Sequence, residues 1–289
     1  MNYFLYLIFI CIGNLIALLP FRLLYILSDI LYYIVYYVIK YRKKIVFENL
    51  HNSFPDKTQA EINIIAKKFY RHFCDILLEI VKLLNISPDE IVRRMKLKTP
   101  ELFFDAYDKK LHILMIIGHY GNWEWGQAVG LQIPYKFIAI YKPLSNKYFD
   151  ELMIKLRSQF QGMVVPMKMA TRVFLNNINN NIPTELNFIA DQTPHIGEIN
   201  FWTQFLNQRT PVFHGVEKLA IKTKQPVFFS KIVKVKRGYY EVYAEKLCDD
   251  ASTLKPHEIT ELHVKALERT IIEAPEYWLW THRRWKYNK

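Results

Sequence analysis

The sequence predicts an α/β fold: a mostly parallel central sheet flanked by helices, preceded by an N-terminal membrane-anchoring helical segment. Downstream of residue 57, short apolar runs alternate with stretches of helical periodicity, as expected of a parallel sheet with helical crossovers. Those runs are continuously apolar, which is typical of strands buried on both faces. By contrast, the first 40 residues consist mainly of two long apolar runs.

The N-terminal segment contains two apolar runs. Residues 3–19 give about 17 residues, the short end of the length that spans a bilayer. The second run, residues 23–39, is interrupted by Ser28 and Asp29, and basic residues at positions 40–44 follow it. Basic residues beside a span favour the cytoplasmic side.

A cleaved signal peptide is the alternative interpretation of this segment. It needs a positively charged start and a small-residue cleavage site, and the sequence shows neither. We therefore predict a retained membrane anchor and interfacial segment at 1–44 and a catalytic domain at 45–289 on the cytoplasmic side. Whether residues 23–39 cross the bilayer or lie along it stays open at this point.

The remaining elements follow from periodicity and turn chemistry. Apolar residues recur at three- and four-residue spacings between 57 and 96, which predicts helix there, and Asn122 is a favoured N-cap residue. Strands are expected at 112–118, 136–141 and 186–191, helices at 122–131, 146–160, 212–223 and 256–273, and a hairpin at 227–246.

Composition narrows the function. The chain has 289 residues, 51% of them apolar, and a formal net charge of +12, which favours anionic lipid or an acidic protein as partner. No nucleic-acid-binding signature accompanies this charge, so nucleic acid is not an expected partner. The three cysteines lack CxxC spacing and are typical of thiols in a reducing compartment.

The segment with candidate chemistry is Gly-His-Tyr-Gly-Asn-Trp-Glu at 118–124. The predicted strand leaves His119 at its carboxyl end, where open α/β sheets place their ligands. Glu124 falls in the first turn of the next predicted helix, and Gly121 permits a sharp bend between them. We therefore expect the Glu124 carboxylate to fold back against the imidazole of His119.

Such a pair suits acyl transfer from a thioester to an alcohol. The donor is already activated, whereas the alcohol is barely ionised at pH 7 and needs a base. A histidine that removes its proton contributes about 10²–10⁴ in rate, and a carboxylate fixes the imidazole tautomer and stabilises the imidazolium. Backbone N–H groups at the start of the following helix are placed to receive the oxyanion.

Each of these residues also has a simpler structural interpretation. Glu124 is an ordinary first-turn acid that complements a helix dipole, and His119 is an ordinary core histidine. A metal site is not predicted, because HExxH is absent. Four other histidines show no metal-ligand spacing: His112, His195, His214 and His282.

Several ordered segments, beginning with the 118–125 motif GHYGNWEW, resemble the lipid A biosynthesis (lauroyl/myristoyl) acyltransferase family. This family lies within the glycerolipid acyltransferase superfamily that shares an H-x4-D/E motif. The resemblance runs along nearly the whole chain. It is carried by RKKIVFENLHNSFP (42–55), GHYGNWEW (118–125), YKPLSNKYFD (141–150), IADQTP (189–194), FWTQFLNQRTPVFHG (201–215) and PEYWLWTHRRWK (275–286).

The resemblance implies a glycerolipid acyltransferase-like fold and transfer of a fatty acyl chain from an acyl-acyl carrier protein to a hydroxyl of a lipid A precursor. This is secondary acylation in lipopolysaccharide biosynthesis, at the inner membrane with the catalytic domain facing the cytoplasm. It implies that His119 is the general base and Glu124 its partner, with no cofactor and no covalent enzyme intermediate. The expected substrate-binding residues are Arg157, Asp191, Asn122 and Gln192.

Some positions depart from the family pattern. Lys142 and Thr203 stand where the family often has Arg and Gly, and the Glu-Gly-Thr-Arg phosphate motif of glycerol-phosphate acyltransferases is missing. Two alternatives therefore remain: acylation of another membrane lipid such as a lysophospholipid or aminolipid, and a non-catalytic protein that binds anionic lipid. The structural alternatives are that Asp191 is a loop cap, that Arg157 is a surface charge, and that the tail 282–286 is a solvated end or a membrane-surface patch.

Overall fold

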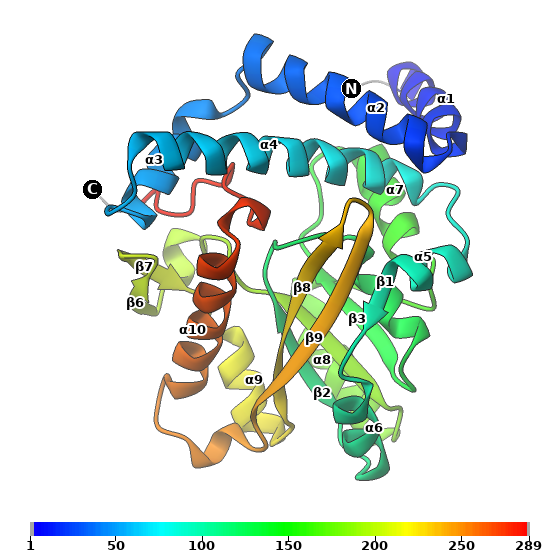
Figure 1. The fold of residues 1–289 in the computed structure, drawn as a ribbon. Coiled ribbons are helices and arrows are strands. Elements are labelled where there is room, and N and C mark those ends of the chain that lie inside the picture. Colours follow the sequence, from blue (N-terminus) through cyan, green and yellow to red (C-terminus); the bar gives the residue numbers. More distant parts are fainter. Residues whose placement is uncertain (1–2, 288–289) are drawn as a thin grey trace.

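The computed structural model describes residues 3–287, apart from the side chain of Phe4, and has a mixed α/β architecture (Figure 1). Its α-helices are α1 (Tyr3–Leu18), α2 (Phe21–Tyr33), α3 (Lys43–Ser53), α4 (Gln59–Lys82), α5 (Pro88–Arg94), α6 (Pro100–Asp108), α7 (Lys147–Arg157), α8 (Met167–Asn179), α9 (Gly215–Thr223) and α10 (Glu258–Glu273). The shorter helices are the π-helix η1 (Ile34–Val38) and the 3-10 turns η2 (Trp125–Leu131), η3 (Ile196–Glu198), η4 (Ala251–Thr253) and η5 (Pro275–Tyr277).

A seven-stranded sheet in the order β1-β9-β8-β2-β5-β3-β4 forms the centre of the fold. All neighbouring pairs in it are parallel except β8–β9, so the predicted fold class is confirmed. A two-stranded antiparallel ribbon lies beside it. The strands are β1 (Met95–Leu97), β2 (Ile113–Ile117), β3 (Lys136–Tyr141), β4 (Met163–Pro166), β5 (Thr184–Ile189), β8 (Val227–Lys236) and β9 (Tyr239–Cys248), with β6 (Phe201–Phe205) and β7 (Gln208–Val212) in the ribbon.

The sheet separates two hydrophobic cores. Along β2, Leu114 and Ile116 contribute to one core and Ile113 and Met115 to the other, because successive side chains of a strand point to opposite faces. Buried residues of α8, α9 and α10 belong to the first core, and those of α5, α6, η2 and α7 to the second. A strand covered on both faces explains why its sequence is continuously apolar rather than alternating.

Most predicted elements are present, with some differences at their ends. The expected helical stretch 57–96 divides into α4 and α5, each with its own N-terminal cap. Thr58 and Glu61 form a capping box at α4, and Ser87 caps α5 ahead of a proline. The expected α-helix at 122–131 is wrong: this segment is the 3-10 helix η2. The α-helices and strands that were not predicted are α3, α6, α8, β1, β4 and the β6–β7 ribbon.

The N-terminal helices lie against α4, which runs across one end of the sheet (Figure 1). Polar contacts attach α2 along its length. Tyr25 donates a hydrogen bond to Glu79 (2.8 Å), Ser28 donates one to Asp75 (2.7 Å), and the guanidinium of Arg237, at the tip of the β8–β9 hairpin, bonds Asp29 and Asp75.

The outward face of the N-terminal helices is apolar. Large apolar side chains on α1 and α2, such as Leu15, Ile26 and Ile30, are more than half exposed. The helical stretch Phe21–Val38 is long and apolar enough to cross a membrane by length and composition, and Leu5–Leu18 is a shorter apolar helix.

The C-terminal tail is not a solvated end, which corrects that interpretation of residues 282–286, whereas Arg283 and Lys286 are exposed and their role as a membrane-surface patch stays a prediction. Arg284 and Trp285 are buried, and Arg284 donates a hydrogen bond to the carbonyl of Pro211 (2.7 Å). Trp285 donates one to Thr210 (2.6 Å). The tail therefore joins the β6–β7 ribbon to the main core.

Candidate active site

The site lies at the carboxyl ends of β2 and β5, which are parallel neighbours. Their register pairs Ile117 with Ile189, so His119 and Asp191 each follow two residues beyond a matched pair. This arrangement brings two residues 72 positions apart in the sequence into direct contact. Parallel strand ends are where such sheets commonly place their ligands.

Asp191 is the carboxylate that contacts His119. Its Oδ1 accepts a hydrogen bond from His119 Nδ1 (2.6 Å), and its Oδ2 accepts from the His119 backbone N–H (2.8 Å) and from Trp278 Nε1 (2.7 Å). A carboxylate can only accept, so Nδ1 carries the proton and Nε2 keeps its lone pair. The imidazole is therefore held in the tautomer that a general base requires.

The pKa of Asp191 reflects these contacts. Burial alone would raise it, but the charge of His119 and the three hydrogen bonds from His119 and Trp278 outweigh burial and lower the pKa to about 2. Asp191 is thus ionised at neutral pH and stabilises positive charge on the ring beside it.

The imidazole of His119 is partly accessible to solvent. The side chain of His119 is 16% exposed. Its Nε2 lies 3.2 Å from the amide nitrogen of Gln192, and its ring meets the ring of Trp123 edge to face, with centroids 5.2 Å apart. Gln192, an expected substrate-binding residue, therefore lies directly beside the nitrogen that would take up a proton.

Glu124 does not occupy the position expected for it. Its two carboxylate oxygens accept hydrogen bonds from Nε (2.8 Å) and Nη2 (2.6 Å) of Arg157, and Oε1 also accepts from Trp123 (3.3 Å). The expected pairing of Glu124 with His119 is therefore wrong. Glu124 is paired with Arg157, and His119 is paired with Asp191.

The Glu124–Arg157 pair is a planar, bidentate ion pair. The Glu124 side chain is 7% exposed, so its charge needs a partner within the protein, and Arg157 is the cation bonded to it. Burial lowers the pKa of Arg157, but the hydrogen bonds and the charge of Glu124 outweigh it and the pKa lies above its usual value. Arg157 is therefore not the free surface charge that the sequence allowed.

Asn122 has a structural position. It is fully buried, its Nδ2 donates a hydrogen bond to Glu79 (2.6 Å), and its Oδ1 accepts one from the backbone N–H of Trp125 (3.0 Å). The expected substrate contact is thus unavailable to this side chain in this conformation. Asn122 instead fixes the loop that carries His119 onto α4.

The expected oxyanion donors, at the start of an α-helix, would here lie in the loop ahead of the 3-10 helix η2. Two amides of this segment are bonded within the protein: Gly121 N–H donates to the Tyr277 carbonyl (3.0 Å) and Gly126 N–H to the Trp123 carbonyl (3.2 Å). Gly121 has a φ of +61°, and a Cβ there would lie 2.4 Å from the carbonyl oxygen of Ile232. Only glycine fits this position.

Two residues near the site were missed in the sequence. Trp278 donates directly to Asp191, and Arg284 lines a mainly apolar cavity beneath it. Among the described residues, Nε and Nη1 of Arg284 and Nε2 of His263, which lines the same cavity, have no hydrogen-bond partner. Burial, opposed by the charge of Asp191, lowers the pKa of Arg284 to about 10. The Trp-x3-His-Arg-Arg pattern of the tail was the sequence signal that could have identified these two residues.

Apolar and basic side chains surround the site. Aromatic side chains of α4, the site loop and the tail lie together beside the site, among them Phe69, Phe73, Trp123 and Tyr277. Lysines follow the carboxyl ends of β3 and β4, at the same edge of the sheet as His119, next to exposed apolar side chains. The exposed residues at this edge are Lys142, Lys147, Lys168, Leu144, Met167 and Met169.

Comparison with known protein families gives a match along almost the whole chain. A family model described as bacterial lipid A biosynthesis acyltransferase matches residues 1–287. The comparison with curated proteins gives no match. The match covers the apolar N-terminal helices, the strand ends that carry His119 and Asp191, and the C-terminal tail.

Proposed function

Because the chain belongs to the bacterial lipid A biosynthesis acyltransferase family, and is thus an acyltransferase of lipid A biosynthesis, we propose that it transfers a fatty acyl chain from an acyl-acyl carrier protein to a hydroxyl of a lipid A precursor. The observation that carries this proposal is the His119–Asp191 hydrogen bond, which leaves Nε2 of an accessible histidine as a proton acceptor.

His119 acts as general base in the proposed reaction. Its Nε2 takes the proton of the acceptor hydroxyl as that oxygen attacks the thioester carbonyl. The tetrahedral intermediate then expels the carrier thiolate, which receives the proton back from the imidazolium, so no covalent enzyme intermediate forms. Asp191 holds the ring and stabilises its positive charge.

Glu124 and Arg157 support this chemistry from beside the ring. Their ion pair, together with the Trp123–Glu124 hydrogen bond, holds the indole of Trp123 against the imidazole. We assign Glu124 a positioning role, with Gln192 as the side chain that meets the substrate at Nε2. Phe69 and Phe73 of α4 lie beside Trp123 and give this side of the site an apolar character that suits an acyl chain.

The lysines at the sheet edge support an anionic acceptor and an acidic carrier protein as partners. Lys142, Lys147 and Lys168 are exposed beside apolar side chains, a combination that suits a phosphorylated lipid headgroup above its acyl chains. A net charge of +12 acts in the same direction.

The proposed location is the cytoplasmic face of the inner membrane. Ser28 and Asp29 lie midway along the apolar stretch Phe21–Val38 and bond Asp75 and Arg237. If this stretch crossed the bilayer, α4 and the hairpin tip would have to enter the hydrocarbon core with it. We therefore propose that residues 1–44 attach domain 45–289 to the membrane with α2 lying along the surface.

The experiment that tests the function compares His119→Ala with His51→Ala. His51 is an exposed histidine of α3, outside the site. Membranes containing the His119 variant should lose about 10²–10⁴-fold in acyl transfer from acyl carrier protein, with full activity in the control. Full activity in the His119 variant would refute the assignment of the base.

The acceptor is identified separately. Mass spectrometry of lipid extracts from a strain lacking the gene should show lipid A species short of one acyl chain. Loss of a chain from a lysophospholipid or aminolipid class instead would assign the enzyme to a different acceptor.

A further inference from the structure

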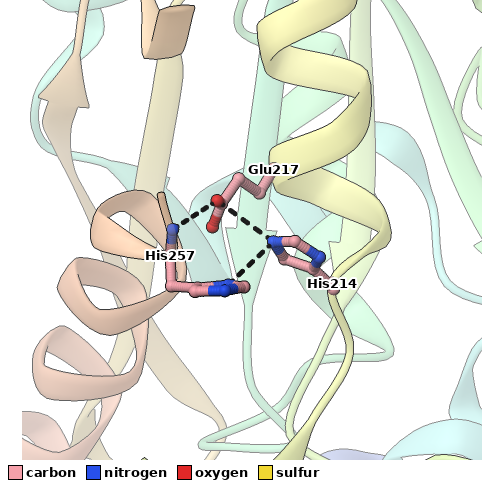
Figure 2. Close-up of side chains that lie close together, drawn as sticks. All are labelled: His214, Glu217 and His257. Atoms are coloured by element: carbon pink, nitrogen blue, oxygen red, sulfur yellow. Dashed lines mark hydrogen bonds and ion pairs between the residues drawn. The ribbon is translucent and has the colours of Figure 1, made fainter. Parts of the chain in front are cut away.

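A second cluster of chemically competent side chains lies outside the proposed active site. In the part of the chain that the structure describes, one group of His, Cys, Asp or Glu residues converges closely enough to hold a metal ion: His214, Glu217 and His257 (Figure 2). His214 and Glu217 lie at the start of α9, and His257 immediately precedes α10. The three ligand atoms lie within 4.8 Å of one another.

The distances match a small four-coordinate cation. His214 Nε2 lies 3.0 Å from Glu217 Oε1 and 3.2 Å from His257 Nδ1. Zinc with bonds of about 2.0–2.1 Å to nitrogen and oxygen keeps tetrahedral ligand atoms about 3.3 Å apart. The His214–Glu217 and His214–His257 distances lie within about 0.3 Å of that spacing, and the third distance, between Glu217 and His257, would have to close from at most 4.8 Å to enclose such an ion.

Hydrogen bonds alone leave one of the three ligand atoms of this cluster poorly paired. A proton on His214 Nε2 faces two acceptors, the Glu217 oxygen and the His257 nitrogen, and one N–H donates well to only one of them. A dication in place of that proton is coordinated by all three atoms at once. Two imidazoles and one carboxylate favour a transition metal of the zinc class over magnesium or calcium, which prefer oxygen ligands.

The ligands are held by a second layer of contacts. Glu217 accepts hydrogen bonds from the backbone N–H of His257 (2.7 Å), the backbone N–H of Thr260 (3.2 Å) and the Thr260 hydroxyl. The ring of Phe201 stacks on His257 with centroids 4.2 Å apart and an interplanar angle of 11°. Such outer contacts orient metal ligands and raise affinity.

We propose that His214, Glu217 and His257 form a binding site for a zinc-class divalent metal, with water completing the coordination at the partly exposed His214. The site joins the starts of α9 and α10 and, through Phe201, the β6–β7 ribbon. Its role is structural, because it lies at the amino end of α10, whereas the carboxyl end leads to Tyr120 beside the active site. Two helix N-termini face the cluster, and the Glu217 carboxylate offsets their positive ends.

The test uses the full-length protein in detergent after removal of metal by a chelator. Wild type should bind one equivalent of Zn²⁺, and Co²⁺ should give the visible spectrum of a four-coordinate ion. His257→Asn keeps the left-handed backbone (φ +68°), which asparagine tolerates, and His214→Gln keeps a polar partner for Glu217. Each variant should bind at least ~100-fold more weakly, while His51→Ala binds like wild type.

The thermal midpoint gives an independent readout. Zn²⁺ should raise the melting temperature of wild type and of His51→Ala, but not that of either ligand variant, because only a bound metal stabilises the fold by mass action. Both ligand variants should show the circular dichroism spectrum of the metal-free wild type. Two results would overturn the proposal: wild type that binds no stoichiometric metal, or ligand variants that bind metal as tightly as wild type. The cluster would then be only a set of hydrogen bonds that cap α10.

Discussion

At the scale of single residues, the two carboxylates near His119 have separate partners. Asp191 bonds the imidazole, and Glu124 bonds Arg157. The sequence indicated His119 from its place after a buried strand, and the family resemblance indicated Asp191 as a site residue. The pairing of the two could not be predicted, because it requires knowing that β2 and β5 are neighbours in the sheet.

The pH dependence of stability provides a prediction for Asp191. Its pKa is lowered from 3.8 to about 2 in the folded protein, so its stabilising contribution is complete above the unfolded value and is lost as pH falls through the folded one. In urea unfolding, the difference in free energy between wild type and Asp191→Asn should be constant near neutral pH and shrink between about pH 4 and pH 2. A difference that does not change over this interval would contradict the ion pair.

The Glu124–Arg157 pair predicts strong coupling. Arg157→Met leaves a carboxylate that is 7% exposed without its partner, which should cost about 3 kcal/mol of unfolding free energy, the lower end for a broken buried pair, since Arg157 is partly exposed. Glu124→Gln should cost a similar amount. The double variant should lose clearly less than the two single losses combined, as measured by a double-mutant cycle in urea. Strict additivity would show that the two side chains act independently.

At the scale of elements, the β8–β9 hairpin and α4 hold both the site loop and the N-terminal helices. Buried Glu79 of α4 accepts hydrogen bonds from Asn122 (2.6 Å), from Tyr240 of β9 (2.7 Å) and from Tyr25 of α2 (2.8 Å). The hairpin and its Arg-Gly turn were predictable from alternation and turn chemistry. The network was not, because four segments distant in sequence contribute to it.

The hairpin turn provides a prediction at this scale. Gly238 has a φ of +75°, and a Cβ there would lie 2.0 Å from the Tyr25 hydroxyl. Gly238→Ala should therefore displace Tyr25 from Glu79 and destabilise the fold by about 1–3 kcal/mol, with faster amide exchange in α2 by mass spectrometry. Gly197→Ala, whose Cβ would have no neighbour nearer than 3.9 Å, is the matched control. Unchanged amide exchange in α2 would show that the hairpin turn does not hold this helix in place.

At the scale of the whole molecule, the N-terminal helices contact both α4 and α7, which follows the carboxyl edge of the sheet. Tyr6 of α1 stacks on Tyr148 at the start of α7, which follows the edge carrying Lys142 (centroids 5.3 Å apart). The apolar runs were predicted as an anchor, and they are helices. Their packing could not be predicted, since an apolar run looks alike whether it faces lipid or protein.

Membrane attachment should depend on the exposed face of α2. Ile26 and Ile30 are 57% and 52% exposed, and transfer of the exposed half of each side chain into lipid contributes about 1–1.5 kcal/mol. Replacing both with asparagine should move a measurable share of the protein from the membrane to the soluble fraction after sonication. Ile272→Asn on α10, where the side chain is 58% exposed, should leave the distribution unchanged. Equal release of both variants would argue against α2 as the membrane face.

The most direct measurement of the central claim is the rate of acyl transfer by His119→Ala, Asp191→Asn and the double variant, each checked for folding. If Asp191 acts through the imidazole, each single change should lower the rate by about 10²–10⁴-fold, and the double variant should be hardly slower than His119→Ala, because the two residues work as a unit. Full activity in Asp191→Asn, or losses that multiply in the double variant, would contradict a base oriented by Asp191.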